Sequence, residues 1–172
     1  TFNVDWFGVY FCARAFLPLL VASPAGCIVN VSSVNGFWAS LGPDTPHTAY
    51  SAAKFAVKGF TEALITDLRV NAPHITAHVV MPGHIGTSIV ANSRKVQSGN
   101  ESDVMTPKEI AQARARIASM GRDAASLSDD EVRKIVADRA RRFLEEAPTS
   151  AAEAARIILD GVRAERWRIL IG

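Results

Sequence analysis

Three short apolar runs, separated by long stretches with helical periodicity, restrict the fold of this chain more than any other feature. They occupy residues 27–32, 75–81 and 167–171 and are rich in Ile and Val. Strands that alternate with helices pair in parallel through right-handed crossovers. Runs without polar alternation are typical of strands buried on both faces. The sequence therefore predicts an α/β fold with a doubly wound parallel sheet.

Two of the intervening segments predict helices of different character. Residues 2–21 are apolar almost throughout, and the polar residues and the proline that interrupt them favour a deeply buried helix over a membrane span or signal peptide. Residues 50–70 repeat apolar side chains at helical spacing. A loop containing Gly36, Gly42, Pro43 and Pro46 precedes this second helix.

The second half of the chain carries clear helix-start signals. Thr106, Ser128 and Ser150 are each followed three residues later by Glu, which is the pattern of a capping box. The polar stretch 91–103 predicts an exposed and mobile loop, because it contains little that a core could bury.

Composition excludes several classes of function. The chain has 172 residues, of which 48% are hydrophobic and 21% charged, as expected for one packed domain. A net charge of +2 is too small to predict binding to nucleic acid or to an anionic membrane. Cys12 and Cys27 form no Cys-x-x-Cys pair, so we expect no disulfide, no zinc site and a cytoplasmic location. The four histidines have no metal-ligand spacing either.

A tyrosine and a lysine form the first candidate site. Ligands of parallel α/β sheets bind beyond the carboxyl ends of the strands, so we expect functional residues in the segments after residues 32 and 81. Tyr50 and Lys54 are four residues apart and share one helix face. A phenol can exchange a proton with a carbonyl oxygen, and a neighbouring ammonium group favours its phenolate form. Taken alone, the spacing fits an amphipathic helix with an exposed lysine equally well.

Several segments taken together resemble the short-chain dehydrogenase/reductase family. Residues 30–33 (Asn-Val-Ser-Ser) resemble its Asn-x-Ser-Ser motif, and residues 48–54 resemble its Tyr-x-x-x-Lys segment. Residues 82–87 (Pro-Gly-His-Ile-Gly-Thr) are similar to its Pro-Gly-x-Ile-x-Thr turn. Asn3 stands where the family carries a fourth catalytic residue. The segment between the serine and the tyrosine is longer than is usual in the family, and we expect it to reach over the substrate.

The resemblance implies a Rossmann-like fold and an oxidoreductase that moves a hydride between NAD or NADP and a carbonyl or secondary alcohol. Tyr50 would be the acid/base, Lys54 would bind the nicotinamide ribose, Ser33 would hold the carbonyl oxygen, and Asn3 would hold a relay water. The implied cofactor-binding residues are Tyr50, Lys54, Pro82, Gly83, Ile85 and Thr87. The choice between NAD and NADP stays open, because in the family the residues that contact the adenosine ribose lie upstream of the position of Thr1.

The same resemblance suggests how the chain is organised. Residues 1–172 would form the C-terminal part of one catalytic domain, with three strands, flanking helices and a substrate lid at residues 91–148. We expect the Gly-rich dinucleotide turn of the family in an N-terminal part that precedes these residues. The helices at 2–21 and 50–70 are more apolar than one sheet face can cover, and the resemblance implies that they pair with their copies in a homodimer or homotetramer.

Two other functions remain as alternatives. A non-catalytic scaffold or truncated pseudoenzyme of the same fold would explain why the dinucleotide turn is not found in these residues. A serine hydrolase would use Ser33, His84 and Asp44, but the sequence lacks the Gly-x-Ser-x-Gly motif of that class. Among the histidines, only His84 lies within a site motif, where it could touch a substrate.

Overall fold

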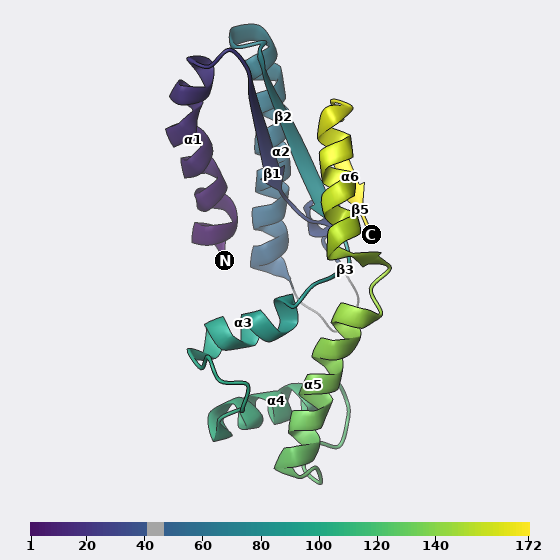
Figure 1. The fold of residues 1–172 in the computed structure, drawn as a ribbon. Helices are drawn as coiled ribbons and strands as arrows, with labels where there is room; N and C mark the ends of the chain where they lie inside the picture. The colour runs from purple at the N-terminus through teal and green to yellow at the C-terminus, as the bar shows by residue number, and fades with distance from the viewer. Residues whose placement is uncertain (41–46) are drawn as a thin grey trace. The chain divides into compact units, whose positions relative to one another are not determined.

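The computed structural model describes residues 1–40 and 47–172 (Figure 1). The described residues form two compact units. The first unit combines residues 1–83 with 152–172, and the second contains residues 84–151. Each unit has its own hydrophobic cluster. Gly42, Pro43 and Pro46 of the predicted loop lie outside the described residues, as does Asp44.

A three-stranded parallel sheet forms the centre of the first unit. Its strands are β1 (Gly26–Val31), β2 (Ile75–Pro82) and β5 (Arg168–Ile171), in the order β1-β2-β5. Both pairings are parallel, and the bounds agree with the three apolar runs to within a residue or two. The predicted Rossmann-like α/β fold is therefore confirmed.

Helices lie on both faces of this sheet. On one face, α1 (Gly8–Val21) and α2 (Thr48–Asn71) pack against Ile28 and its paired neighbour Ala77. On the other face, α6 (Ala151–Arg163) packs on Ile169, and Gly161 permits this close approach, because a Cβ there would lie 2.7 Å from the isoleucine side chain.

β1 is covered on one face only. Val29 and Val31 are 39% and 49% exposed, and Cys27 on the same side is exposed as well. The prediction of a fully buried strand is wrong for β1, because α6 reaches Ile169 of β5 and leaves this side of β1 open. It holds for β2, which is buried along most of its length.

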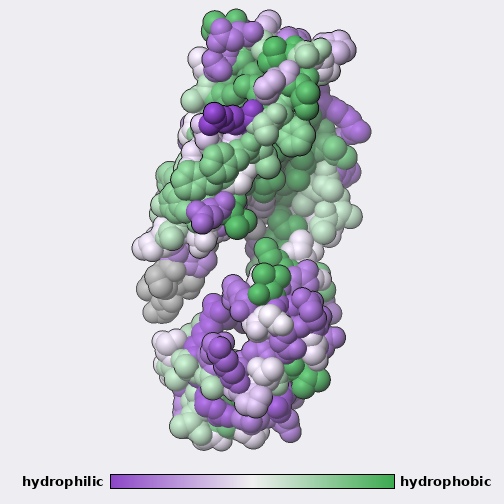
Figure 2. Space-filling model, turned by 90° about the vertical axis from the view of Figure 1, so that its left-hand side faces the viewer, coloured by the Kyte–Doolittle hydropathy of each residue, from purple (hydrophilic) through white to green (hydrophobic). Residues whose placement is uncertain are grey.

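The first helix is not deeply buried, so that prediction is also wrong. A π-helical segment, Asn3–Phe7, leads into α1, and neither contains a buried residue. Its inner side packs on α2, where Trp6 and Tyr10 meet the edge of Phe60. Its outer side is exposed in the part of the chain that the structure describes, where Phe16 and Leu19 are 59% and 67% exposed. Figure 2, which faces the side of the molecule where α1 lies, shows hydrophobic residues gathered over the first unit.

The second unit consists of three helices and a small sheet. Its elements are β3 (Ile85–Gly86), α3 (Ile89–Ser98), α4 (Pro107–Ser119), α5 (Asp129–Glu145) and β4 (Thr149–Ser150). Strands β3 and β4 pair in parallel. Complete capping boxes begin α4 at Thr106 and α5 at Ser128, which confirms both predicted helix starts, and α6 begins directly after Ser150.

Helix α3 occupies most of the stretch that the sequence predicts to be a loop. Arg94 of α3 forms an ion pair of 2.7 Å with Glu109, and Lys95 forms one of 2.8 Å with Asp103. Gly99 ends the helix in the left-handed conformation that glycine adopts without strain. The prediction was wrong because ion pairs hold this polar helix, and its acidic partners Asp103 and Glu109 lie beyond its C-terminal end.

Glu109 joins the polar contacts of the second unit. Its carboxylate accepts hydrogen bonds from the Thr106 backbone N–H at 2.7 Å and from the Asn100 side chain at 2.9 Å, and it pairs with Arg94. The backbone N–H of Thr106 is the largest cause that holds the pKa of this carboxyl far below its usual range, followed by the hydrogen bond from Asn100. One carboxylate therefore connects the start of α4 to α3.

The depressed pKa of Glu109 predicts how stability depends on pH. Such a group stabilises the fold above its unfolded pKa of about 4.3, and the stabilisation is lost as the pH falls toward its folded value. We expect Glu109→Gln to lower the free energy of unfolding at pH 7, with a gap to the wild type that narrows below about pH 4. Urea denaturation across this pH range measures the gap.

The matched control is Glu131→Gln in the capping box of α5. Ser128 holds this carboxylate through its backbone N–H and its hydroxyl. We expect this variant to lower the free energy of unfolding at pH 7 by less than Glu109→Gln does. The role assigned to Glu109 would be contradicted if Glu109→Gln lowered the free energy of unfolding no more than Glu131→Gln does. It would also be contradicted if the effect of Glu109→Gln did not change with pH.

Candidate active site

A set of buried polar contacts fixes α2 against the carboxyl end of β1. Ser32 donates a hydrogen bond of 2.8 Å to the backbone carbonyl of Lys54. Asn35, which is 2% exposed, donates one of 3.1 Å to the Ser51 hydroxyl. Further along, Asn30 donates to Thr61 at 3.0 Å. These contacts set the register of the helix on the strand, because a buried polar group that loses its partner costs about 1–3 kcal/mol.

Ser33 lies just beyond β1, at the N-cap of a short 3-10 helix, Val34–Gly36. The side chain is buried, and its Oγ accepts a hydrogen bond of 3.2 Å from the backbone N–H of Asn35. Within residues 1–40 and 47–172, the hydroxyl has no acceptor for its own proton. Ser33 is therefore free to donate a hydrogen bond to a ligand oxygen.

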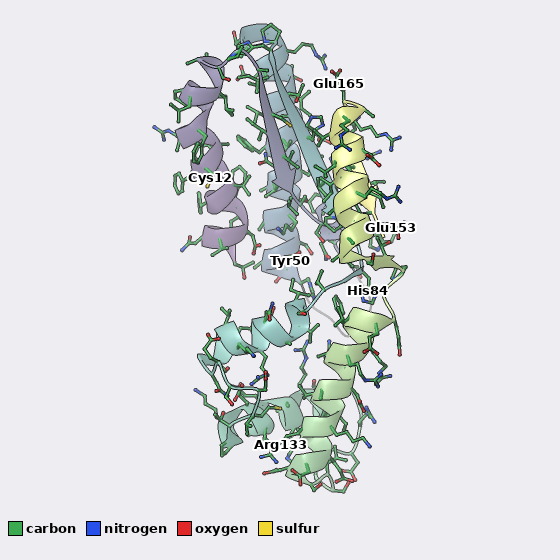
Figure 3. The ribbon with its side chains drawn as sticks, viewed as in Figure 1. Cys12, Tyr50, His84, Arg133, Glu153 and Glu165 are labelled. Carbon is green, nitrogen blue, oxygen red and sulfur yellow. The ribbon has the colours of Figure 1, made fainter. Side chains whose placement is uncertain are left out.

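Tyr50 and Lys54 share the first turns of α2, as their spacing predicts. Figure 3 labels Tyr50 near the start of this helix. The Lys54 ammonium lies 5.5 Å from the centroid of the Tyr50 ring, and His47 meets the same ring edge-on at 5.8 Å. Lys54 also donates a hydrogen bond of 3.2 Å to the carbonyl of Val31, the last residue of β1. The phenol and the ammonium therefore stand at the strand end that the sequence points to.

The π-helical segment brings a carboxylate to this lysine. Asp5 lies 3.5 Å from the Lys54 ammonium, and both side chains are partly buried. The wider π turn, in which the Gly8 N–H donates to the Asn3 carbonyl, is a geometry often found at functional sites. Asn3 begins the same turn with an exposed side chain. The structure thus joins Lys54 to Asp5, and Asn3 stands two residues away.

The predicted cofactor-binding turn is divided between the two units. Pro82 ends β2, and the Gly83 N–H donates a hydrogen bond of 2.7 Å to the Ile171 carbonyl. A Cβ on Gly83 would lie 3.5 Å from Val34, next to Ser33 in the chain. Ile85 and Thr87 belong to the second unit, where Ile85 pairs with β4.

The histidines are held by ordinary structural contacts. His78 is buried in β2, where its Nδ1–H donates to the Arg166 carbonyl at 2.7 Å and Nε2 meets the Thr76 hydroxyl. His84 donates from Nε2 to the Phe143 carbonyl in the second unit. In the part of the chain that the structure describes, no group of His, Cys, Asp and Glu could hold a metal ion.

Sequence reasoning missed the residues that position the site. Asp5, Ser32, Asn35 and Ser51 are single polar residues without a periodic signal, and their partners lie far away in the chain. Gly36 was seen only as part of a loop. A Cβ at this position would collide with the Ser32 hydroxyl and would lie 2.9 Å from the Lys54 carbonyl.

The model of the short chain dehydrogenase family matches residues 1–98, which is more than half of the chain. The protein belongs to this family. The matched region contains Asn3, Ser33, Tyr50 and Lys54 and extends through Thr87. Family membership argues against the serine hydrolase alternative, whose Asp44 lies outside the described residues.

Curated relatives match about half of the chain. The chain is 44% identical over 91 residues to SadH of Mycobacterium tuberculosis, which is named as an oxidoreductase, and this segment covers 53% of the chain and 32% of SadH. It is 37% identical over 91 residues to the 3-ketodihydrosphingosine reductase of Bacteroides thetaiotaomicron, covering 52% of the chain and 31% of that enzyme. The matched part is thus about a third of each relative.

Solved structures of the family share the fold over nearly the whole chain. A short-chain dehydrogenase/reductase from Burkholderia phymatum, crystallised with NAD, superposes with a TM-score of 0.65 at 24% identity. The superposition covers 98% of this chain and 51% of that one. The chain therefore spans about half the length of that enzyme.

The close packing at Gly36 predicts a test of the geometry around the site. We expect Gly36→Ala to lower the free energy of unfolding by about 1–3 kcal/mol, because the added methyl group would push Ser32 away from the Lys54 carbonyl. Gly59→Ala is the matched control inside α2, where a Cβ meets nothing within 4 Å and helix propensity favours alanine by about 1 kcal/mol. Chemical denaturation measures both, and equal effects would contradict the tight packing at Gly36.

Proposed function

We propose that this protein is an NAD- or NADP-dependent oxidoreductase that interconverts a carbonyl compound and a secondary alcohol. One observation carries the proposal: the Lys54 ammonium lies beside the Tyr50 ring at the end of β1, where Ser33 also lies, with a hydroxyl proton that has no acceptor among the described residues. Family membership and relatives that are named as a reductase and an oxidoreductase support the same reaction type.

Tyr50 is the proton donor in the proposed reduction. A reduced nicotinamide, when bound, would supply a hydride for the carbonyl carbon. The Tyr50 phenol would give its proton to the carbonyl oxygen, which leaves an alcohol and a phenolate. The Lys54 ammonium favours that phenolate. Ser33 donates a hydrogen bond to the same oxygen, and Asn3 holds a water through which Tyr50 regains its proton. In the oxidation direction each proton moves the opposite way.

Residues at the strand ends suit the cofactor. The partly buried Lys54 ammonium is a donor for the hydroxyls of the nicotinamide ribose, and Tyr50 stands next to it. Pro82, Gly83, Ile85 and Thr87 face the nicotinamide carboxamide in our proposal. Gly83 suits this role because its backbone is fixed on Ile171 and carries no side chain to fill the strand end.

The remaining features of the proposal concern the intact protein. A dinucleotide-binding part, outside residues 1–172, would hold the adenosine half of the cofactor, and residues 91–148 would form the substrate lid. We place the protein in the cytoplasm. By length and composition the helix Asn3–Val21 could cross a membrane. However, its Asp5 pairs with Lys54 and its Trp6 packs on Phe60, so one side of it is already bound to α2.

A homodimer or homotetramer completes the proposal. Several aromatic and aliphatic side chains of α1 are exposed, among them Phe11, Phe16 and Leu19, and Phe55 of α2 is exposed as well. Clusters of exposed apolar side chains are typical of protein interfaces. We propose that α1 and α2 pack against the same helices of a second copy.

Two variants of the intact protein test the assigned reaction. Tyr50→Phe should lower kcat by at least about a hundredfold while cofactor affinity stays within a few-fold, because only the transferable proton is removed. Lys54→Ala should weaken both cofactor binding and turnover. Cofactor fluorescence titration and the change in nicotinamide absorbance with a panel of ketones and secondary alcohols measure these effects.

Each variant can contradict the proposal separately. Tyr50→Phe with activity within tenfold of the wild type would remove Tyr50 from its role. Unchanged cofactor affinity in Lys54→Ala would contradict the role of Lys54 in cofactor binding. Failure of the wild type to bind NAD or NADP would favour a non-catalytic scaffold.

A further inference from the structure

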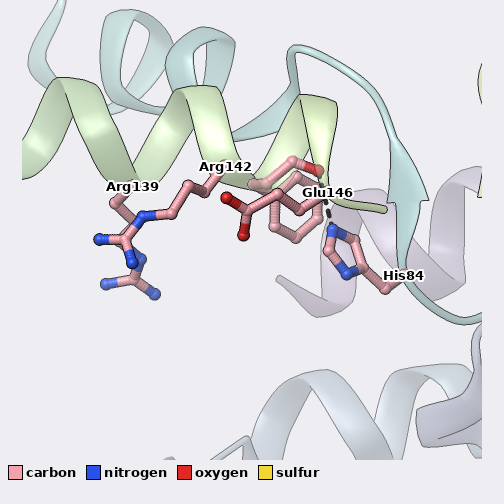
Figure 4. Close-up of a pocket in the computed structure, with 5 residues that line it drawn as sticks. His84, Arg139, Arg142 and Glu146 are labelled. Carbon is pink, nitrogen blue, oxygen red and sulfur yellow. Dashed lines mark hydrogen bonds between the residues drawn. The ribbon is translucent and has the colours of Figure 1, made fainter. Parts of the chain in front are cut away.

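A pocket of about 380 Å³ lies entirely within the second unit (Figure 4). Its walls come from the segment that begins the unit and from the C-terminal half of α5, and the lining residues are His84, Arg139, Arg142, Phe143 and Glu146. Arg139 and Arg142 lie one helical turn apart and project toward the same side of α5. Two guanidinium groups therefore face one small space.

The charges of these two arginines are not neutralised within the structure. On the same helix, Arg133 pairs with Asp130, and Arg141 pairs with Asp138 and Glu145. Across residues 1–40 and 47–172, neither Arg139 nor Arg142 forms an ion pair. Partial burial and the nearby positive charge of Arg116 both lower the pKa of Arg139, which shows that its charge is disfavoured where it stands. An anion in the pocket would relieve this cost.

Two aromatic rings, one from each of these segments, also line the pocket and are held in place. The His84 ring lies 4.2 Å from the Phe143 ring, and its Nε2–H donates a hydrogen bond of 2.8 Å to the Phe143 carbonyl. Gly86 packs directly on the end of α5, since a Cβ there would lie 2.5 Å from the Leu144 carbonyl oxygen. The two segments that form the pocket are thus fastened together, and the pocket is preformed.

We infer that this pocket binds a small organic anion, whose carboxylate or phosphate group lies against Arg139 and Arg142 and whose apolar part rests on Phe143 and His84. Guanidinium groups suit such anions, because their planar N–H groups match two oxygens at once. Glu146 lines the same pocket and repels the bound anion, so it limits affinity. The inference does not depend on the proposed redox reaction, because Tyr50, Lys54 and Ser33 belong to the first unit.

Calorimetric titration of the full chain tests this inference with three probes: phenyl phosphate, benzoate and inorganic phosphate. We expect saturable binding of at least one aromatic anion, and weaker binding of inorganic phosphate, which has no apolar part. Comparing phenyl phosphate with benzoate shows whether the pocket prefers a phosphate or a carboxylate.

Variants locate the binding in the pocket. Arg139→Gln and Arg142→Gln should each weaken the binding of the preferred aromatic anion by about tenfold, because each removes one charge-assisted hydrogen bond. Glu146→Gln should strengthen binding a few-fold, because it removes a like charge. The matched control is Arg141→Gln, which removes the same charge from the same helix at an arginine that is already paired, and it should change affinity by less than about twofold. Circular dichroism checks that each variant is folded.

Three results would overturn the inference. The first is the absence of saturable binding of either aromatic anion to the wild type. The second is a loss in Arg141→Gln as large as in Arg142→Gln, which would mean attraction by overall charge. The third is inorganic phosphate binding as tightly as the preferred aromatic anion, which would leave the aromatic rings without a role.

Discussion

The hydrogen bond from the Ser32 side chain to the Lys54 carbonyl is the contact on which the candidate site depends. Together with the Asn35–Ser51 contact, it holds the first turns of α2 against the end of β1. A slip of one helical turn would move Tyr50 and Lys54 by about 5.4 Å, which is beyond the reach of a hydrogen bond to a shared ligand. The positions of Tyr50 and Lys54 relative to a bound ligand therefore depend on this register of α2 on β1.

The sequence predicted the elements whose signal is local. Apolar runs identified the strands to within a residue or two, and capping boxes located the starts of α4 and α5. It failed where a partner elsewhere in the chain decides the structure. The polar helix α3 depends on Glu109 and Asp103, and the exposure of α1 depends on what lies beside it. Polar residues that position the site, such as Asn35, have no periodic pattern to reveal them.

The two units are stabilised in different ways, which suits the different roles that we propose for them. The first buries apolar side chains between a parallel sheet and its helices, and this rigid support carries Ser33, Tyr50 and Lys54. The second is held by a small apolar cluster and by a polar network around Glu109, while α5 leaves two arginines unpaired over a pocket.

The central claim is that Ser33 and Tyr50 act on one substrate oxygen, with Lys54 beside the cofactor. The most direct test is a crystal structure of the intact protein with bound NAD or NADP, in which the distance between the Ser33 and Tyr50 hydroxyl oxygens is measured. A single oxygen that accepts hydrogen bonds from both requires a separation within about 6 Å, and our account predicts this value. A separation beyond about 10 Å, with the intervening chain ordered, would contradict it.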